Sequence, residues 1–319
     1  DTFIGIVLEG TRIVMAEVTQ EGNILQTKIC QSAFFNQESA LNMIIGSLHD
    51  MENQGWKERP RAIGVGLIGR VDPKGGVWFQ MDPDRSHAIN FTEAISKEFH
   101  LPCFIDNDVK CGANAVRKWG YGSNTNDFIY LYVGTGIAAS IVSNGTMLRG
   151  AHYNAGEVGH LRVGVQVGVR CPCGRMDCVE SIASMMGIDR CARFLRPYYD
   201  TRLHFPDKDT MISADEVFQL ARTGDPLCAK LVGNASEALA NLIMNLVRVS
   251  DPDTVILGGE MVADGFLIEE IRRHLQPVTM RFVTNGVVLT KLNPRLINLL
   301  GAASIAMDGM AAKQQMSTL

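Results

Sequence analysis

The sequence lacks the features that would suit it to a nucleic acid or to a membrane. Its 30 lysines and arginines are outnumbered by 34 aspartates and glutamates, and the basic residues form no run or stripe, so we expect no nucleic-acid surface. No apolar stretch reaches the roughly 18 residues that a membrane-spanning helix needs. A secretory leader is also lacking, and we therefore expect a cytoplasmic protein.

Low-complexity linkers are lacking as well, and the composition is that of an ordinary globular protein. Of the 319 residues, 46% are hydrophobic and 20% are charged, and the formal net charge is −4. Both fractions are common values for globular chains. The length predicts two domains, each large enough for its own core, with no flexible spacer between them.

The eight cysteines fall into two groups. Cys171, Cys173 and Cys178 follow a C-x-C-x4-C spacing, and His160 lies eleven positions before the first of them. Three thiolates and one imidazole complete a tetrahedral zinc site with no position left for water, so this pattern predicts a structural zinc; the alternative is a group of ordinary buried thiols. The other cysteines stand singly in apolar contexts and are expected to be buried free thiols: Cys30, Cys103, Cys111, Cys191 and Cys228.

Two glutamates flank the predicted zinc ligands. Glu157 stands three residues before His160, and Glu180 stands two residues after Cys178. A loop held by zinc would fix both carboxylates in place. Such an arrangement favours a rigid site for a polyhydroxylated ligand.

The hydrophobic pattern alternates strands with helices and repeats once. Residues 2–29 predict a meander of three strands, and residues 128–142 begin a second meander that continues through a hairpin turn at Asn144 and Gly145. Helical spacing follows each meander. We therefore predict a duplicated α/β fold. Further strands are expected at residues 62–68, 103–105 and 254–257, and helices at 41–48, 91–98, 109–119 and 231–247.

The predicted domains are residues 1–120 and 121–301. The boundary is placed near residues 119–126, where glycine, serine and asparagine gather. The final helix, at about 302–319, is expected to pack back onto the first domain.

Turns with small residues occur at corresponding places in the two halves. The first is Gly10-Thr11, the second is Gly134-Thr135-Gly136, and a Gly258-Gly259 pair follows a late strand. Backbone N–H groups in such turns approach an anion closely, and a threonine hydroxyl adds a donor. Each turn alone would suit a plain tight hairpin equally well. Together they predict a nucleotide phosphate site in an interdomain cleft.

The Asp106-Asn107-Asp108 segment lies where a buried strand is predicted to give way to a helix. A carboxylate at such a switch point can take a proton from a substrate hydroxyl. Aspartate is also a good helix N-cap. The residues alone leave Asp108 open between a general base and a cap.

Five motifs resemble, in their order along the chain, those of the ROK family of sugar kinases and repressors. They are FIDND, VGTGI, AGEVGH, CPCGRMDCVE and VILGG, and the resemblance runs over residues 3–306. It implies an actin/hexokinase-like (ribonuclease H-like) fold, ATP-dependent phosphorylation of a hexose or N-acetylhexosamine at the 6-hydroxyl, bound Mg²⁺ and Zn²⁺, and a homodimer. The repressor branch carries an additional N-terminal helix-turn-helix domain. Because this sequence begins directly in the first strand, the kinase branch is favoured.

The resemblance also implies roles for single residues. Asp108 matches the family's catalytic base, and His160, Cys171, Cys173 and Cys178 match its zinc ligands. The sugar-binding positions correspond to Gly69, Asn107, Glu157, His160 and Glu180. The nucleotide-binding positions correspond to Gly10, Thr11, Arg12, Gly134, Thr135, Gly136, Ile137, Gly258 and Gly259.

The first phosphate motif departs from the family's D-x-G-G-T, because this chain has Val7 in place of the aspartate and Glu9 in place of a glycine. The missing aspartate would help to hold magnesium. A carboxylate about 5 Å from a phosphate charge costs roughly 3 kcal/mol at an effective dielectric constant of 20, which is about a hundredfold in affinity. The second turn is followed by Ala138-Ala139-Ser140 where glycines are usual, and Asp177 replaces a glycine of the zinc loop. The nucleotide site therefore departs more from the family than the sugar and zinc sites do.

Two functions follow from this pattern. The first is a sugar kinase with an altered ATP site. The second is a non-catalytic sugar-binding or regulatory protein that keeps the fold and the zinc loop without turnover. The identity of the sugar stays open, since only the short IGRVD motif at residues 68–72 resembles N-acetylmannosamine kinases.

Overall fold

The computed structural model describes residues 1–9, 12–31, 36–80 and 88–317. The chain divides into two compact units. Unit 1 comprises Asp1–Asn124, Arg149–Ala155 and Leu296–Leu319, and unit 2 comprises Thr125–Leu148 and Gly156–Arg295. The chain thus passes from one unit to the other four times. The domain limits given by the sequence reading stay a prediction.

Unit 1 is built on a five-stranded sheet with the order β3-β2-β1-β4-β8. The first three strands form an antiparallel meander, and β4 and β8 add to it in parallel. The strands are β1 (Thr2–Glu9), β2 (Arg12–Thr19), β3 (Ile24–Gln31), β4 (Pro60–Leu67) and β8 (Cys103–Asn107). A smaller antiparallel sheet contains β5 (Arg70–Asp72), β6 (Val77–Gln80) and β7 (Ile89–Asn90).

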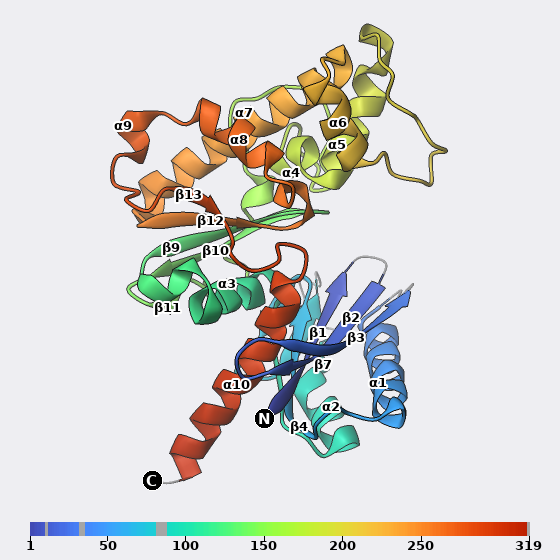
Figure 1. Cartoon of the computed structure of the whole chain (residues 1–319), viewed down its shortest axis with the longest axis vertical. Coiled ribbons are helices and arrows are strands. Elements are labelled where there is room, and N and C mark those ends of the chain that lie inside the picture. The colour runs from blue at the N-terminus through green and yellow to red at the C-terminus, as the bar shows by residue number, and fades with distance from the viewer. Residues whose placement is uncertain (10–11, 32–35, 81–87, 318–319) are drawn as a thin grey trace. The chain divides into compact units, whose positions relative to one another are not determined.

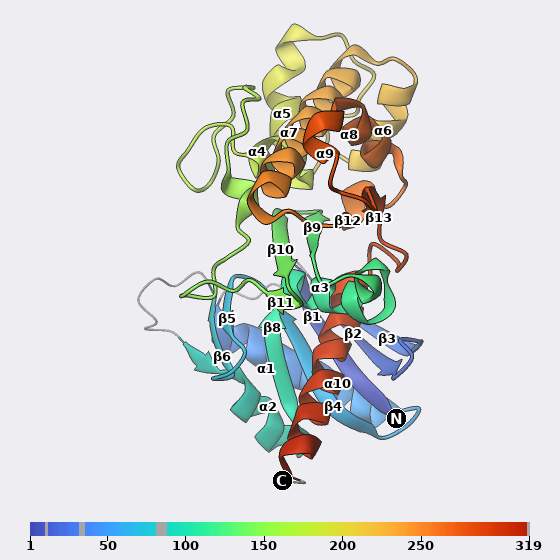
Figure 2. The same ribbon diagram turned by 90° about the vertical axis from the view of Figure 1, so that its left-hand side faces the viewer.

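Helices cover both faces of the unit 1 sheet (Figure 2). On one face, α1 (Gln37–Gln54) and α2 (Phe91–Phe99) pack their apolar residues against the strands in one core cluster. The other face holds α3 (Asp108–Trp119), which leads into η1 (Tyr121–Asn124), and α10 (Ile297–Ser317). The α10 backbone approaches β4 so closely that a Cβ added to Gly64 would lie 1.8 Å from the carbonyl oxygen of Ala302. Only glycine fits there.

Unit 2 repeats the same sheet. Its order is β11-β10-β9-β12-β13, with an antiparallel meander followed by two parallel strands. Figure 1 shows these strands beneath the helices of the same unit. The strands are β9 (Phe128–Val133), β10 (Ile137–Ser143), β11 (Thr146–Met147), β12 (Thr254–Gly258) and β13 (Val287–Leu289). The identical order and pairing confirm the predicted duplication.

The core of unit 2 centres on the long helix α7 (Pro226–Ser250), which packs on the sheet and on its neighbouring helices. Asp225 caps α7 by accepting the N–H of Cys228, and proline occupies the first turn, where no N–H is needed. The other helices are η2 (Val158–His160), α4 (Val179–Ala183), α5 (Met185–Leu195), η3 (Arg196–Tyr198), α6 (Ala214–Arg222), η4 (Glu260–Val262), α8 (Phe266–His274) and α9 (Pro277–Met280).

The elements expected from the hydrophobic pattern are confirmed. Each predicted strand and helix overlaps an observed one, and the hairpin turn has positive φ at Asn144 and Gly145. The sequence analysis did not identify the small sheet of unit 1, whose strands are only two to four residues long, or the helices α4, α5, α6, α8 and α9 and the strand β13 of unit 2. In the part of the chain described, every helix is too short or too polar to cross a bilayer.

Candidate functional site

The junction of β8 and α3 in unit 1 holds the predicted catalytic residue. Asn107 caps α3, because its side-chain oxygen accepts the N–H groups of Val109 (3.1 Å) and Lys110 (3.2 Å). Asp108 is therefore the first residue inside the helix and not its cap. The capping explanation for Asp108 is wrong, while its role as a base stays a prediction.

Asn107 also joins two of the predicted sugar-binding positions. Its side-chain amide donates to the carbonyl oxygen of Gly69 at 3.1 Å, and Gly69 itself has a φ of 75°, which favours glycine. Asn107 thus holds the turn before β5 against the start of α3. The structure brings Gly69, Asn107 and Asp108 together within unit 1.

The position where the family has its first aspartate lies next to this junction. Val7 is buried in β1, and a Cβ added to Gly66 would lie 3.0 Å from Cγ1 of Val7 and 3.3 Å from Cα of Asp108. An apolar side chain thus points toward the beginning of α3. Gly10 and Thr11, the predicted first phosphate turn, lie outside the described residues, whereas Arg12 begins β2 and pairs with Glu9.

The second predicted phosphate turn, Gly134-Thr135-Gly136, joins β9 to β10 in unit 2. The N–H of Gly134 donates to the carbonyl oxygen of Gly136 at 3.0 Å. The N–H of Ile137, a predicted phosphate donor, donates to the carboxylate of Glu180 at 3.0 Å. A carboxylate of the protein thus already occupies one of the amide groups that the sequence reading assigned to phosphate.

A second carboxylate lies at the same turn. Oε2 of Glu260 accepts the hydroxyl of Tyr132 at 3.0 Å, and a Cβ added to Gly134 would lie 2.3 Å from that oxygen. Glu260 directly follows the Gly258-Gly259 pair, in which Gly259 has a φ of 101° and its N–H donates to Pro294. The glycine pair therefore lies beside the predicted phosphate turn, and Glu260, which follows it, places a carboxylate there.

Glu180 also joins the turn to the AGEVGH segment. Gly156 accepts the N–H of Ala139 in β10 at 2.9 Å, and Glu157 follows it at the start of η2. A Cβ added to Gly159 would lie 2.3 Å from the carbonyl oxygen of Ile137 and 3.2 Å from Oε2 of Glu180. The two glycines of this motif let the segment lie directly on β10 and Glu180.

The predicted zinc ligands converge in unit 2. The ligand atoms of His160, Cys171, Cys173 and Cys178 all lie within 4.8 Å of one another. The sulfur atoms of Cys173 and Cys178 are 3.6 Å apart, and Nδ1 of His160 is 3.5 Å from the sulfur of Cys171. Ligands about 2.3 Å from a tetrahedral zinc stand at about this mutual spacing. The four residues therefore fit a closed, structural zinc site.

The thiols of this cluster differ in acidity. A hydrogen bond with the backbone of Arg175 is the main cause that lowers the pKa of Cys173 to about 6, whereas burial raises the pKa of Cys178 to about 12. Burial also raises the pKa of Cys171. Zinc would bind all three residues as thiolates and would therefore displace the protons of Cys171 and Cys178.

Asp177, which replaces a glycine of the family, organises the zinc loop. Its φ is 55°, the left-handed region that explains why glycine is usual at this position. Its buried carboxylate accepts the N–H groups of Val167 (3.1 Å), Gly168 (2.8 Å) and Val169 (3.1 Å). The substitution therefore keeps the turn and adds three hydrogen bonds to the loop.

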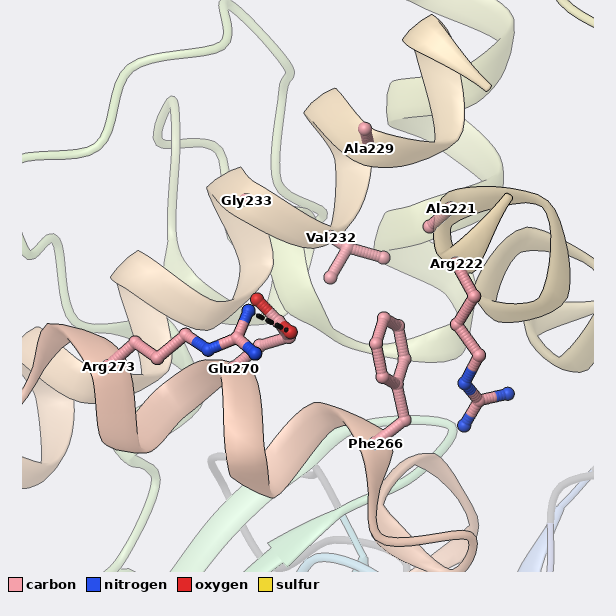
Figure 3. A pocket seen from close by; sticks show the side chains of 8 residues that line it. All are labelled: Ala221, Arg222, Ala229, Val232, Gly233, Phe266, Glu270 and Arg273. Atoms are coloured by element: carbon pink, nitrogen blue, oxygen red, sulfur yellow. Dashed lines mark hydrogen bonds and ion pairs between the residues drawn. The ribbon is translucent and has the colours of Figure 1, made fainter. Parts of the chain in front are cut away.

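A cavity of about 410 Å³ lies elsewhere in unit 2, between α6, α7 and α8 (Figure 3). None of the residues predicted for sugar, nucleotide or zinc lines it. Its two arginines are already paired: Arg222 with Asp264 at 2.7 Å and Arg273 with Glu270 at 2.7 Å. The cavity carries no uncompensated charge from these arginines, and we do not assign it to the site.

Several residues of the site were not predicted. Tyr132 and Glu260 meet across 128 residues of sequence, and Asp106 pairs with Arg149 across 43. Glu260 could have been suspected because it directly follows the glycine pair, whereas nothing in the local pattern marks Arg149. The predicted sugar residues divide between the units: Gly69 and Asn107 lie in unit 1, and Glu157, His160 and Glu180 lie in unit 2.

Residues 3–308 match the sequence model of the ROK family. The chain is 26% identical to a glucokinase of Halalkalibacterium halodurans, over 99% of this chain and 96% of that protein. It is also 26% identical to a xylose repressor of Caldicellulosiruptor bescii, over 86% of this chain and 72% of that one. Kinases and repressors thus both occur among its relatives.

The fold agrees with a solved structure as well. A ROK family glucokinase from Streptomyces griseus, in complex with glucose and AMPPNP, superimposes with a TM-score of 0.77 at 24% identity, over 97% of this chain and 100% of that chain. This likeness shows the mixed α/β fold of ROK sugar kinases.

Proposed function

We propose that this chain, which belongs to the ROK family, phosphorylates a hexose or N-acetylhexosamine at its 6-hydroxyl, with Asp108 as the general base. The observation that carries this proposal is the β8–α3 junction. Asn107 supplies the helix cap there, and Asp108 is the first residue of the helix that follows, directly beside the Asn107–Gly69 contact. The similarity to glucokinases supports the same reaction class.

In this mechanism the chain binds, orients and deprotonates the sugar. Asp108 takes the proton of the attacking hydroxyl, while Gly69, Asn107, Glu157, His160 and Glu180 are proposed to bind the other polar groups of the sugar. ATP with Mg²⁺ supplies the phosphoryl group. Thr11, Thr135 and the turn amides are proposed to hold the phosphates, and the zinc keeps the loop between His160 and Cys178 in place. We also propose a cytoplasmic homodimer.

A substrate panel read by ADP release tests the proposal. Glucose, fructose, allose, N-acetylglucosamine and N-acetylmannosamine are compared, and at least one should give ADP with a matching sugar phosphate. Asp108→Asn should keep the fold, the zinc and most of the sugar affinity while kcat falls by about 10²- to 10⁴-fold. A variant with wild-type kcat would remove Asp108 from the mechanism.

A second function has observations in its favour. Val7 leaves the first turn without its metal-side carboxylate, and Glu260 places a carboxylate beside the second turn. These features suit a sugar-binding or regulatory protein without turnover, and repressors are among the relatives. Titration calorimetry with the same sugars and with ATP-Mg²⁺ separates the two functions. Tight sugar binding without nucleotide binding would decide for the second.

A further inference from the structure

The short segment Arg149–Ala155 belongs to unit 1, although the chain before and after it belongs to unit 2. The N–H of Ala155 donates to the carbonyl oxygen of Arg149 at 3.2 Å, which closes the segment into a loop. Gly150 has a φ of 74° within it. Two residues after the loop ends comes Glu157, a proposed sugar ligand in unit 2.

Both ends of this loop are fixed to the residues around Asp108. At one end the guanidinium of Arg149 donates to both carboxylate oxygens of Asp106, at 2.8 and 2.7 Å. At the other end the ammonium of Lys110 donates to the carbonyl oxygen of Ala155 at 3.0 Å. Two of these three side chains are almost fully buried, with Asp106 4% and Lys110 5% exposed. The anchors lie two residues before and two residues after Asp108.

Stability alone does not explain these buried charges. Removing an ion pair from water costs nearly as much as the pair gains, so apolar residues of similar volume are often as stabilising. A bidentate arginine–carboxylate pair does fix a direction and a distance, which an apolar contact does not. The buried ion pair of Asp106 and Arg149 is therefore suited to holding the loop in a defined position.

We propose that Asp106, Arg149 and Lys110 are positioning residues that hold the loop Arg149–Ala155 against the start of α3, which carries Asp108. The loop acts as a tether within unit 1 that keeps the proposed base in its orientation. This inference rests on the proposed function for its effect on turnover. The tether itself is a property of the chain and can be tested without a substrate.

The decisive variant replaces the ion pair by apolar residues, Asp106→Leu with Arg149→Met. Because an apolar pair is about as stabilising as the ion pair, the melting temperature should stay near that of the wild-type protein. The tether should nevertheless loosen. Hydrogen exchange at the amides of residues 149–155 should become faster, and kcat for the best sugar should fall about a hundredfold, as expected when reacting groups are displaced by about 1 Å. KM should change less than kcat.

Matched controls keep the result interpretable. Lys110→Met removes only the anchor to Ala155 and should loosen the same amides if the double variant does not fold. Arg149→Lys keeps the positive charge but cannot make the bidentate contact. Its kcat should lie between that of the wild-type protein and that of the double variant. Lys28→Met breaks an ion pair with Asp50 (2.9 Å) elsewhere in unit 1 and should change neither readout. Zinc content should be unchanged in all four proteins.

Two outcomes would overturn the inference. One is a folded double variant with wild-type exchange and wild-type kcat, and the other is a Lys110→Met protein whose amides exchange as in the wild type. If the wild-type protein phosphorylates no hexose, the proposed function fails on its own, and the exchange comparison still decides whether the tether exists.

Discussion

The hairpins β1–β2 and β9–β10 occupy equivalent places in two sheets of the same order, and negative charge accompanies both. In unit 1 the charge is local, because Glu9 stands beside the turn in the sequence. In unit 2 the turn itself is neutral, and the carboxylates of Glu180 and Glu260 arrive from distant segments. Equivalent turns of a duplicated fold can therefore have acidic residues nearby by different routes, one through the local sequence and one through tertiary packing.

The largest effect is expected from a variant that disturbs the β9–β10 hairpin and leaves the β1–β2 hairpin unchanged. Glu180 contacts the β9–β10 turn and follows the predicted zinc loop in the sequence. Cys173→Ser removes a proposed zinc ligand from the loop before the helix that carries Glu180, so the melting temperature and the sugar affinity should fall together. Calorimetry measures the melting temperature, titration measures the sugar affinity, and elemental analysis measures the zinc content. Cys30→Ser in unit 1 is the control and should retain about one zinc per chain. Freshly purified wild-type protein without zinc would end the zinc hypothesis.

A smaller effect is expected from repairing the first hairpin. Val7→Asp with Glu9→Gly should raise ATP affinity and turnover, and Glu9→Gly should supply most of the gain. Roughly 3 kcal/mol of relieved repulsion corresponds to about a hundredfold in affinity, less what solvent and salt already screen. Nucleotide titration of the double variant and of both single variants checks this.

Sugar affinity without nucleotide serves as the internal control of that experiment and should not change. Val7→Asp alone should lower stability, since it places a carboxylate at a buried position near Asp108. An unchanged ATP affinity in the double variant would mean that the first turn does not face the phosphates.

The smallest effect is expected at the second hairpin. Glu260→Gln removes the charge beside Gly134 but keeps the shape, and ATP affinity should rise about tenfold, because this partly exposed carboxylate is screened by solvent. Glu269→Gln, in the exposed pair with Arg272, is the matched control of unit 2 and should have no effect. Weaker ATP binding by Glu260→Gln would show instead that the carboxylate contacts the nucleotide or its metal.

The sequence predicted the fold well because the fold depends on local periodicity. The pattern of apolar and turn-forming residues close together in the sequence predicts the alternating strands, the turns between them and the helix of residues 231–247. The structure confirms these elements. The zinc cluster was also predictable, since its ligands lie within 19 residues. What could not be predicted depends on distant pairs.

The site shows the same limit residue by residue. The sequence could not tell whether Asp108 or Asn107 caps α3, because both residue types cap helices well; only the hydrogen bonds of Asn107 decide it. The sequence showed only that Asp177 replaces a glycine of the family. The structure shows that its carboxylate accepts three backbone N–H groups of the zinc loop. The partners of Glu260 and Arg149 are set by tertiary packing, which no sequence period encodes.

The close approach of α10 to β4 has a consequence for the order of events on the ribosome. The strands of unit 1 are synthesised first, but the helix that covers one face of their sheet is synthesised after all of unit 2. The core of unit 2 can therefore form before α10 is available to pack on β1 and β4. In this chain we expect the second unit to mature first, which reverses the usual N-terminal-first order of folding during synthesis.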